Sequence, residues 1–140
     1  MFNHKKNISS IVFFGTPEFA RFCLDYLIDK SFDIKGVVTA PDRKAGRGKK
    51  VKSSSVKIYS EKLGLKIFQP LNLSDSFFVS KLKDLCADIY IVVAFRMLPK
   101  KVWSIPPLGT INLHASLLPN YRGAAPINWV LINGESKTGV

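Results

Sequence analysis

The sequence predicts an α/β fold in which helices cover both faces of a doubly wound, mostly parallel open sheet. Three observations lead to this prediction. Apolar runs of strand length alternate with segments whose apolar residues recur at helical spacing. The run at 88–94, DIYIVVA, is almost continuously apolar and β-branched, which is typical of a strand buried on both faces of a parallel sheet. No internal repeat or linker interrupts the 140 residues, so a single domain is expected.

The first predicted unit is a strand at 11–14, a turn at Gly15 and a helix. Thr16 is expected to cap this helix and Pro17 to occupy its first position. Its apolar residues at three- and four-residue spacing are Phe19, Phe22, Cys23, Tyr26 and Leu27. Gly15 permits a close approach that a side chain would block. Because the GxGxxG glycines of a dinucleotide site are missing, a plain turn and a ligand site at the helix amino end both remain open.

A second predicted strand at 34–39 leads directly into a strongly basic stretch at 42–52, DRKAGRGKKVK. This stretch contains six cations and one acid, Asp42, so its net charge is +5. The whole chain has a net charge of +11. The cations are Arg43, Lys44, Arg47, Lys49, Lys50 and Lys52. The glycines argue against a helix, so a mobile loop is expected. Such a loop suits phosphate contacts, and the charge excess points to a polyanionic partner, nucleic acid before a membrane surface.

Two more helices and two strands are predicted between 53 and 94. The first helix is expected between Ser53–Ser55 and Gly64, with three residues turned inward: Val56, Tyr59 and Leu63. A short strand at 65–68 follows. The next helix, 74–86, is expected to place four apolar residues in the core: Phe77, Phe78, Leu82 and Leu85. The buried strand at 88–94 completes this part of the sheet.

Two polar residues stand at the end of the last predicted strand, which follows a short helix and turn at 102–107. Asn112 and His114 are two apart and therefore lie on one face of a strand. An amide donor beside an imidazole can stabilise an oxyanion and carry a proton for an attacking amine. The alternative is structural, since a histidine or asparagine at a strand end commonly serves a turn. The segments 116–119 and 121–123 would wrap a ligand laid over this strand end.

The composition argues against several classes of protein. No run of about 18 apolar residues is present, so no membrane span is predicted. The first ten residues, MFNHKKNISS, lack the apolar core of a secretory signal. Cys23 and Cys86 have neither C-x-x-C spacing nor a nearby histidine cluster. They are expected to be reduced thiols of a cytoplasmic protein rather than a disulfide or metal ligands.

Six stretches of the sequence resemble the folate-dependent formyltransferases: FFGTPEFA, VVTAPDRKAGRGKK, SSVKIYSEKLGLKIFQP, ADIYIVVAF, LPKKVW and PLGTINLHASLLPNYRGAAPINW. Together they resemble the amino-terminal domain of the branch that acts on methionyl-tRNA, in which the loop matching the basic stretch enters the end of the acceptor stem. The resemblance implies that residues 1–140 form a Rossmann-like formyltransferase catalytic domain shortened at its carboxyl end.

The resemblance also implies roles for individual residues. Asn112 and His114 are two of three catalytic residues, and the third, an aspartate, is expected shortly beyond Val140 together with a carboxy-terminal tRNA-binding domain. The residues expected at the folate site are Phe95, Met97, Ser116, Leu117, Leu118 and Pro119. Those expected to contact tRNA are Arg43, Lys44, Arg47, Lys49 and Lys50. Arg47 matches an arginine that is functionally important in the family.

One segment departs from the family pattern. Phe95-Arg96-Met97 stands where many relatives carry a Tyr-Gly pair and one residue more. The pocket wall formed by this segment is therefore expected to differ from that of the relatives. Arg96 either meets the anionic tail of the folate or faces solvent.

The implied activity is transfer of the formyl group of 10-formyltetrahydrofolate, without a metal, to the α-amine of initiator methionyl-tRNA for translation initiation. A monomer is expected for the complete protein, and the 140-residue piece alone is expected to be inactive. Two alternatives stay open. In the first alternative, the formyl acceptor is the amine of a sugar nucleotide or of glycinamide ribotide, although the basic stretch argues against both. In the second alternative, the domain is a non-catalytic RNA-binding module.

Overall fold

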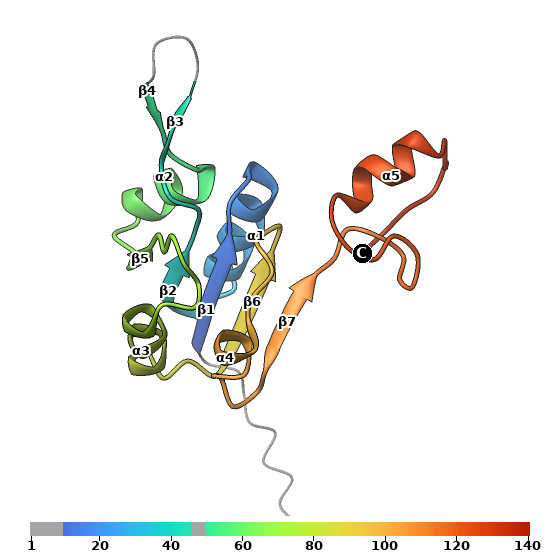
Figure 1. Cartoon of the computed structure of the whole chain (residues 1–140). Helices are drawn as coiled ribbons and strands as arrows, with labels where there is room; N and C mark the ends of the chain where they lie inside the picture. The colour runs from blue at the N-terminus through green and yellow to red at the C-terminus, as the bar shows by residue number, and fades with distance from the viewer. Residues whose placement is uncertain (1–9, 46–49) are drawn as a thin grey trace, which may run out of the picture.

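The computed structural model describes residues 10–45 and 50–140 (Figure 1). Its main sheet has five strands, all parallel, in the order β5-β2-β1-β6-β7. The strands are β1 Ser10–Gly15, β2 Asp33–Val38, β5 Ile67–Phe68, β6 Ile89–Val93 and β7 Thr110–Leu113. The predicted parallel α/β sheet is confirmed.

Helices cover both faces of this sheet, as a doubly wound fold requires (Figure 1). One face carries α1 Glu18–Asp29 and α2 Ser55–Lys62. The other carries α3 Ser76–Asp84 and α4 Lys100–Trp103. Among the described residues the longest helix is α1, with twelve residues, and none is long and apolar enough to cross a membrane.

The strand β1 lies in the middle of the sheet and contributes to the core on both faces. Val12 and Phe14 pack with α3 and α4, whereas Phe13 packs with α1 and α2. All three side chains are completely buried. This alternation follows from the two-residue period of a strand, and burial of each such side chain stabilises the fold by about 1.5–3 kcal/mol.

The turn after β1 brings helix α1 unusually close to the sheet. A Cβ atom placed on Gly15 would lie 2.7 Å from the Cβ of Ala20, so the expected close approach at this glycine is confirmed. The expected cap at Thr16 is wrong, because the helix begins one residue later, with Pro17 at the N-cap position and no side-chain cap. Pro17 has an extended conformation there and leads into the first turn of the helix.

Several apolar residues of the helices face solvent, and two of them, Leu63 and Phe77, are expected in the core. On α1 the buried residues are Ala20 and Leu24, while the large side chains exposed are Phe19, Phe22 and Tyr26. Leu63 follows the end of α2 as its C-cap residue and is 47% exposed. Phe77, at 72% exposed, lies on α3 beside Lys81, and Phe78, Val79 and Leu82 fill the core. Helical spacing shows that a helix is amphipathic, but the elements packed against the helix decide which stripe is buried.

The basic stretch forms part of an antiparallel ribbon rather than only a loop. Strand β3, Arg43–Ala45, pairs with β4, Lys50–Lys52, and Arg43 lies opposite Lys52. This hairpin projects beyond the carboxyl ends of the parallel strands (Figure 1). Arg47 and Lys49 lie outside the described residues.

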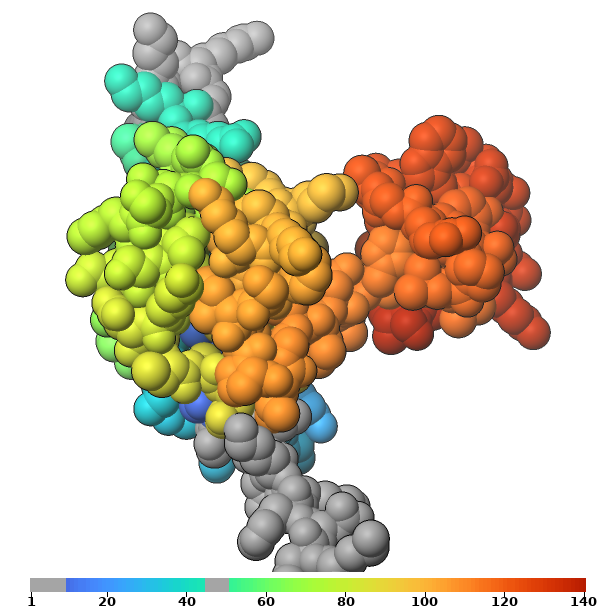
Figure 2. All heavy atoms as spheres, turned by 60° about the horizontal axis from the view of Figure 1, so that its bottom comes forward, coloured from blue at the N-terminus to red at the C-terminus, as the bar shows by residue number. Residues whose placement is uncertain are grey.

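The chain after β7 forms a separate lobe beside the sheet (Figures 1 and 2). It contains α5, Pro126–Ile132, whose exposed apolar residues include Ile127, Trp129, Leu131 and Ile132. Among the described strands β7 pairs with β6 alone, and Ile111 is about half exposed. The last strand and the lobe therefore present apolar surface.

Candidate active site

A pocket of about 490 Å³ opens at the carboxyl ends of β6 and β7. One wall is the segment that leaves β6, and the other is the end of β7 with the loop beyond it. The residues that matter for its chemistry are Phe95, Arg96, Met97, Asn112 and His114. Residues of the segment 95–98 and the two polar residues at the end of β7 thus line one pocket.

Asn112 and His114 occupy the end of the edge strand. Asn112 is the third residue of β7 and lies opposite Val92 of β6, so its position is fixed by the sheet register. His114 follows the last residue of β7 and is half-buried. Both side chains contribute to the pocket, as two residues of the same strand face can.

The imidazole of His114 is held by one backbone contact. Its Nε2 atom lies 2.9 Å from the carbonyl oxygen of Tyr121. A carbonyl oxygen only accepts, so Nε2 carries the hydrogen in this contact. In a neutral ring Nδ1 then remains as a proton acceptor. With Nε2 engaged in this way, Nδ1 is the ring atom left to accept a proton.

The loop between 116 and 125 is stabilised by its own side chains. Ser116 is buried, and its hydroxyl donates to the carbonyl oxygen of Asn120 at 2.7 Å. Tyr121 has a left-handed φ of 55°, and its hydroxyl donates to the carboxylate of Glu135. The Nδ2 of Asn133 donates to the same hydroxyl at 3.0 Å. The Glu135 contact raises the pKa of the Tyr121 phenol. Tyr121 is thus tied to the end of α5, a link that no local sequence pattern reveals.

The residues expected at the folate site separate into two groups. Phe95 and Met97 line the pocket, with Phe95 packed on Phe14 and Met97 94% exposed. The residues of the turn after His114 are not among those that line it: Ser116, Leu117, Leu118 and Pro119. Leu117 and Leu118 are more than half exposed, and the Leu117 side chain packs on Gly139. Their folate contacts stay a prediction.

Arg96 is exposed, as one of the two expected alternatives has it, and it also contacts the backbone of another segment. Its guanidinium donates to the carbonyl oxygens of Leu71 at 3.0 Å and Pro70 at 2.7 Å. It also lies over the ring of Phe95, 5.4 Å from the centroid. Arg96 therefore fixes the turn that follows β5 while lining the pocket that contains His114.

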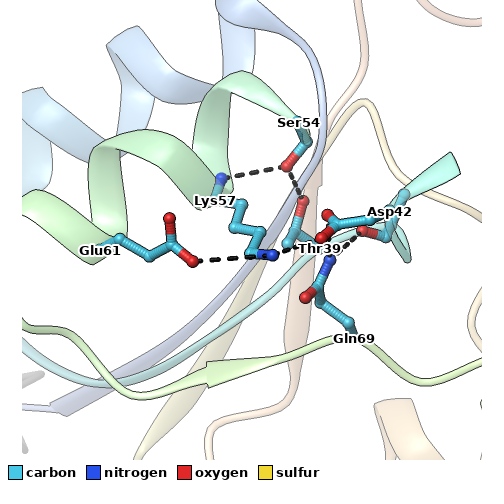
Figure 3. Close-up of polar contacts among 7 residues, drawn as sticks. Thr39, Asp42, Ser54, Lys57, Glu61 and Gln69 are labelled. Carbon is cyan, nitrogen blue, oxygen red and sulfur yellow. Dashed lines mark hydrogen bonds and ion pairs between the residues drawn. The ribbon is translucent and has the colours of Figure 1, made fainter. Parts of the chain in front are cut away.

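A polar network fixes the base of the basic hairpin (Figure 3). The Nζ of Lys57, on α2, lies 2.5 Å from Asp42 Oδ2 and 3.6 Å from the carboxylate of Glu61. The Nε2 of Gln69 donates to Asp42 Oδ1 and to the Ala40 carbonyl, both at 2.9 Å. The Lys57 contact, and then the Gln69 contact, hold the pKa of Asp42 below its usual value. Asp42 in turn raises the pKa of Lys57.

The adjoining hydroxyls extend this network to the sheet. Thr39 and Ser54 share a hydrogen bond of 2.7 Å, and Ser54 caps α2 by accepting from the Lys57 amide at 3.0 Å. The cap expected within 53–55 is confirmed at Ser54. Asp42, the single acid of the basic stretch, is therefore engaged with α2 and the chain after β5 rather than with the neighbouring cations.

The described cations expected to contact tRNA lie on the two strands of the hairpin. Arg43 and Lys44 are exposed on β3, and Lys50 belongs to β4. In residues 10–45 and 50–140 no three His, Cys, Asp or Glu side chains come together as candidate metal ligands. Cys23 is half-buried and Cys86 exposed, and both are free thiols.

Comparison with proteins of known sequence gives close relatives. The chain is 62% identical over 130 residues to the methionyl-tRNA formyltransferase of Flavobacterium johnsoniae, covering 93% of this chain and 41% of that protein. It is 53% identical over 136 residues to the methionyl-tRNA formyltransferase of Bacteroides thetaiotaomicron, covering 97% of this chain and 42% of that protein. The chain thus spans about two-fifths of the length of these curated relatives.

Solved structures share the fold at low sequence identity. The phosphoribosylglycinamide formyltransferase of Bacillus halodurans superposes with a TM-score of 0.72 at 13% identity, covering 93% of this chain and 68% of that one. The glycinamide ribonucleotide transformylase 1 of Geobacillus kaustophilus superposes with a TM-score of 0.70 at 17% identity, covering 94% of this chain and 71% of that one. The family model described as formyl transferase matches residues 9–140. With this match over nearly its whole length, the chain belongs to the formyl transferase family.

Proposed function

We propose that the gene product containing this chain transfers the formyl group of 10-formyltetrahydrofolate to the α-amine of initiator methionyl-tRNA. One observation carries the proposal: Asn112 and His114 line one pocket in a chain 62% identical to a methionyl-tRNA formyltransferase. In this proposal residues 1–140 belong to the amino-terminal catalytic domain, and the reaction takes place in the cytoplasm during translation initiation.

The pocket residues account for the chemistry of amide formation. The α-amine of the methionyl group attacks the formyl carbon, and the amide of Asn112 donates to the oxyanion that develops. Nδ1 of His114, left free by the Tyr121 contact, accepts the proton lost by the attacking nitrogen. The bond between the formyl carbon and the folate nitrogen then breaks, and that nitrogen receives a proton as tetrahydrofolate leaves. An imidazole suits both transfers because its ordinary pKa is about 6.5.

Each proposed substrate has a surface suited to it: the pocket for the folate and the basic hairpin for tRNA. The pocket of about 490 Å³ has the size and the partly apolar wall of a small-molecule site, with Phe95 and Met97 against the folate. The turn at 116–119 is proposed to close over it. The cations proposed to contact tRNA phosphates are Arg43, Lys44 and Lys50, with Arg47 and Lys49 from outside the described residues. The aspartate expected beyond Val140 completes this proposed site.

The basic hairpin favours tRNA over the other acceptors. The solved structures that share the fold are named for glycinamide ribotide, but at 13% and 17% identity they support the fold alone. Binding of a small sugar phosphate does not require a ribbon of cations that extends beyond the strand ends. A non-catalytic RNA-binding module would use the hairpin and leave the polar pair in the pocket without a role.

The decisive experiment is formyl transfer by the purified gene product to three acceptors: methionyl-tRNA, uncharged tRNA and glycinamide ribotide. Labelled formyl should appear only on methionyl-tRNA. Variants His114→Ala and Asn112→Ala provide the matched controls for the pocket. Transfer to glycinamide ribotide would replace the proposed acceptor. Tight tRNA binding without any transfer would favour the binding module.

A further inference from the structure

A second pocket, of about 450 Å³, lies between the base of the basic hairpin and the segment that leaves β6. The side chains that define its chemistry are Thr16, Arg43, Lys52, Ser53 and Arg96. They come from the turn after β1, from both strands of the hairpin and its exit, and from the end of β6. Three cations and three hydroxyl residues, Thr16, Ser53 and Ser54, thus line one cavity.

The strand register of the hairpin places two of these cations face to face. Arg43 is paired directly with Lys52 in the antiparallel ladder of β3 and β4. Like charges directly opposite each other destabilise a strand pair. Among the described residues no carboxylate forms an ion pair with either cation, because Asp42 is engaged by Lys57 and Gln69. An anion seated between Arg43 and Lys52 would remove this repulsion.

Arg96 supplies the third cation and connects the two pockets. Its guanidinium has five N–H donors, of which two are used by Leu71 and Pro70. These bonds orient the guanidinium while leaving donors for a ligand. Arg96 lines both this cavity and the pocket that contains Asn112 and His114. A ligand in the second pocket therefore lies next to the proposed reaction centre.

We propose that this second pocket binds a phosphate group of a nucleotide. The inference rests on the proposed function, in which the ligand is a backbone phosphate near the acceptor end of tRNA. A phosphate presents oxygens in several directions and suits cations that approach from different segments, with Arg43 and Arg96 able to bind it in bidentate fashion. The pocket would hold the acceptor strand between the hairpin and the catalytic pair.

The test is a titration of the isotope-labelled gene product with AMP, followed at the backbone amides of Thr16 and Ser53. Adenosine reports binding that needs no phosphate, and tetrahydrofolate reports binding of carboxylates. Arg43→Ala and Lys52→Ala should each weaken AMP binding by about tenfold or more, as expected for loss of one hydrogen bond to a charged group. Lys62→Ala is the matched control, because it removes the same charge from the end of α2 and Lys62 does not line this pocket.

A second variant tests the repulsion itself. Lys52→Glu should abolish AMP binding yet raise the melting temperature without ligand, since an opposite charge then faces Arg43. Specific shifts with AMP, retained in Lys62→Ala and weakened in Arg43→Ala and Lys52→Ala, support the proposal. Equal weakening in Lys62→Ala would overturn it, as would shifts at these amides with adenosine or with tetrahydrofolate.

Formyl transfer measured on the same samples separates this inference from the proposed function. If AMP binds as described and methionyl-tRNA is not formylated, the phosphate site stands and the proposed function fails. If methionyl-tRNA is formylated while AMP leaves Thr16 and Ser53 unchanged, the phosphate site fails and the proposed function stands.

Discussion

The Nε2 atom of His114 lies 2.9 Å from the carbonyl oxygen of Tyr121, a residue whose own hydroxyl is held at the end of α5 by Glu135 and Asn133. The orientation of the imidazole therefore depends on contacts of the lobe beside the sheet. Tyr121 has a positive φ, which turns its carbonyl toward the histidine rather than along an extended chain. The proposed proton acceptor is thus positioned by a neighbouring lobe and not by the sheet alone.

Tyr121→Phe should lower kcat by about ten- to a hundredfold, because small displacements of a reacting group are costly to rate. The KM for each substrate should change little, since the lost hydroxyl is bonded to Glu135 and Asn133 and not directed into the pocket. The measurement is steady-state kinetics across the pH range. Tyr26→Phe is the control, as its exposed ring makes no hydrogen bond within the described residues. A loss of thermal stability with unchanged kcat would make the contact purely structural.

Asp42→Asn should lower the melting temperature at neutral pH, because it removes the charge that faces Lys57. The folded-state pKa of Asp42 lies below its ordinary value of 3.8. Its contribution to stability is therefore present above that pH and is lost as the pH falls through the folded-state pKa. The difference in melting temperature between the wild type and the variant should shrink in that acid range.

Thermal melts of Asp33→Asn provide the comparison for this prediction. Asp33 pairs with Lys35 at 2.6 Å, but both side chains are about half exposed, so little stability is expected from the pair. If Asp42→Asn were no more destabilising than Asp33→Asn, the network at the hairpin base would not fix the hairpin.

The parallel sheet could be predicted because the buried positions of each strand are occupied by apolar residues. The run at 89–93 is apolar at every position because it packs on both faces, and Val12, Phe13 and Phe14 are apolar for the same reason. Asn112 and His114 could be placed at the pocket because strands in this fold end at one edge. These inferences need only short stretches of chain.

Contacts between distant segments could not be predicted in this way. Lys57 lies fifteen residues from Asp42, and Arg96 lies 25 residues from Leu71, so no local period links either pair. The exposed Phe77 shows the same limit on a helix, since spacing allows several apolar stripes and only the neighbouring elements choose one. The ribbon at 43–45 and 50–52 could not be predicted because its charged residues, with two glycines in the sequence between them, are typical of a loop.

Arg47→Ala should weaken binding of methionyl-tRNA and reduce the slope of its salt dependence by about one, as expected for one lost phosphate contact. Tetrahydrofolate affinity should be unchanged. Both affinities can be measured by equilibrium titration at several salt concentrations. Lys62→Ala, at the end of α2, removes the same charge from outside the hairpin and should have little effect. An equal loss of tetrahydrofolate affinity in Arg47→Ala would assign this arginine to the small-molecule pocket.

Asn112→Ala and His114→Ala should each lower kcat by about two to four orders of magnitude, the range for loss of an oxyanion donor or a general acid–base. Substrate affinities should change little, because both groups act mainly in the transition state. The effects should be strongly non-additive, since each side chain serves the same reacting centre. Single-turnover formyl transfer by both single variants and the double variant measures this, with folding checked by thermal melting. If instead these residues only hold the end of β7, melting temperatures should fall while the folded protein keeps a near-normal rate, and that result would remove both from the catalytic site.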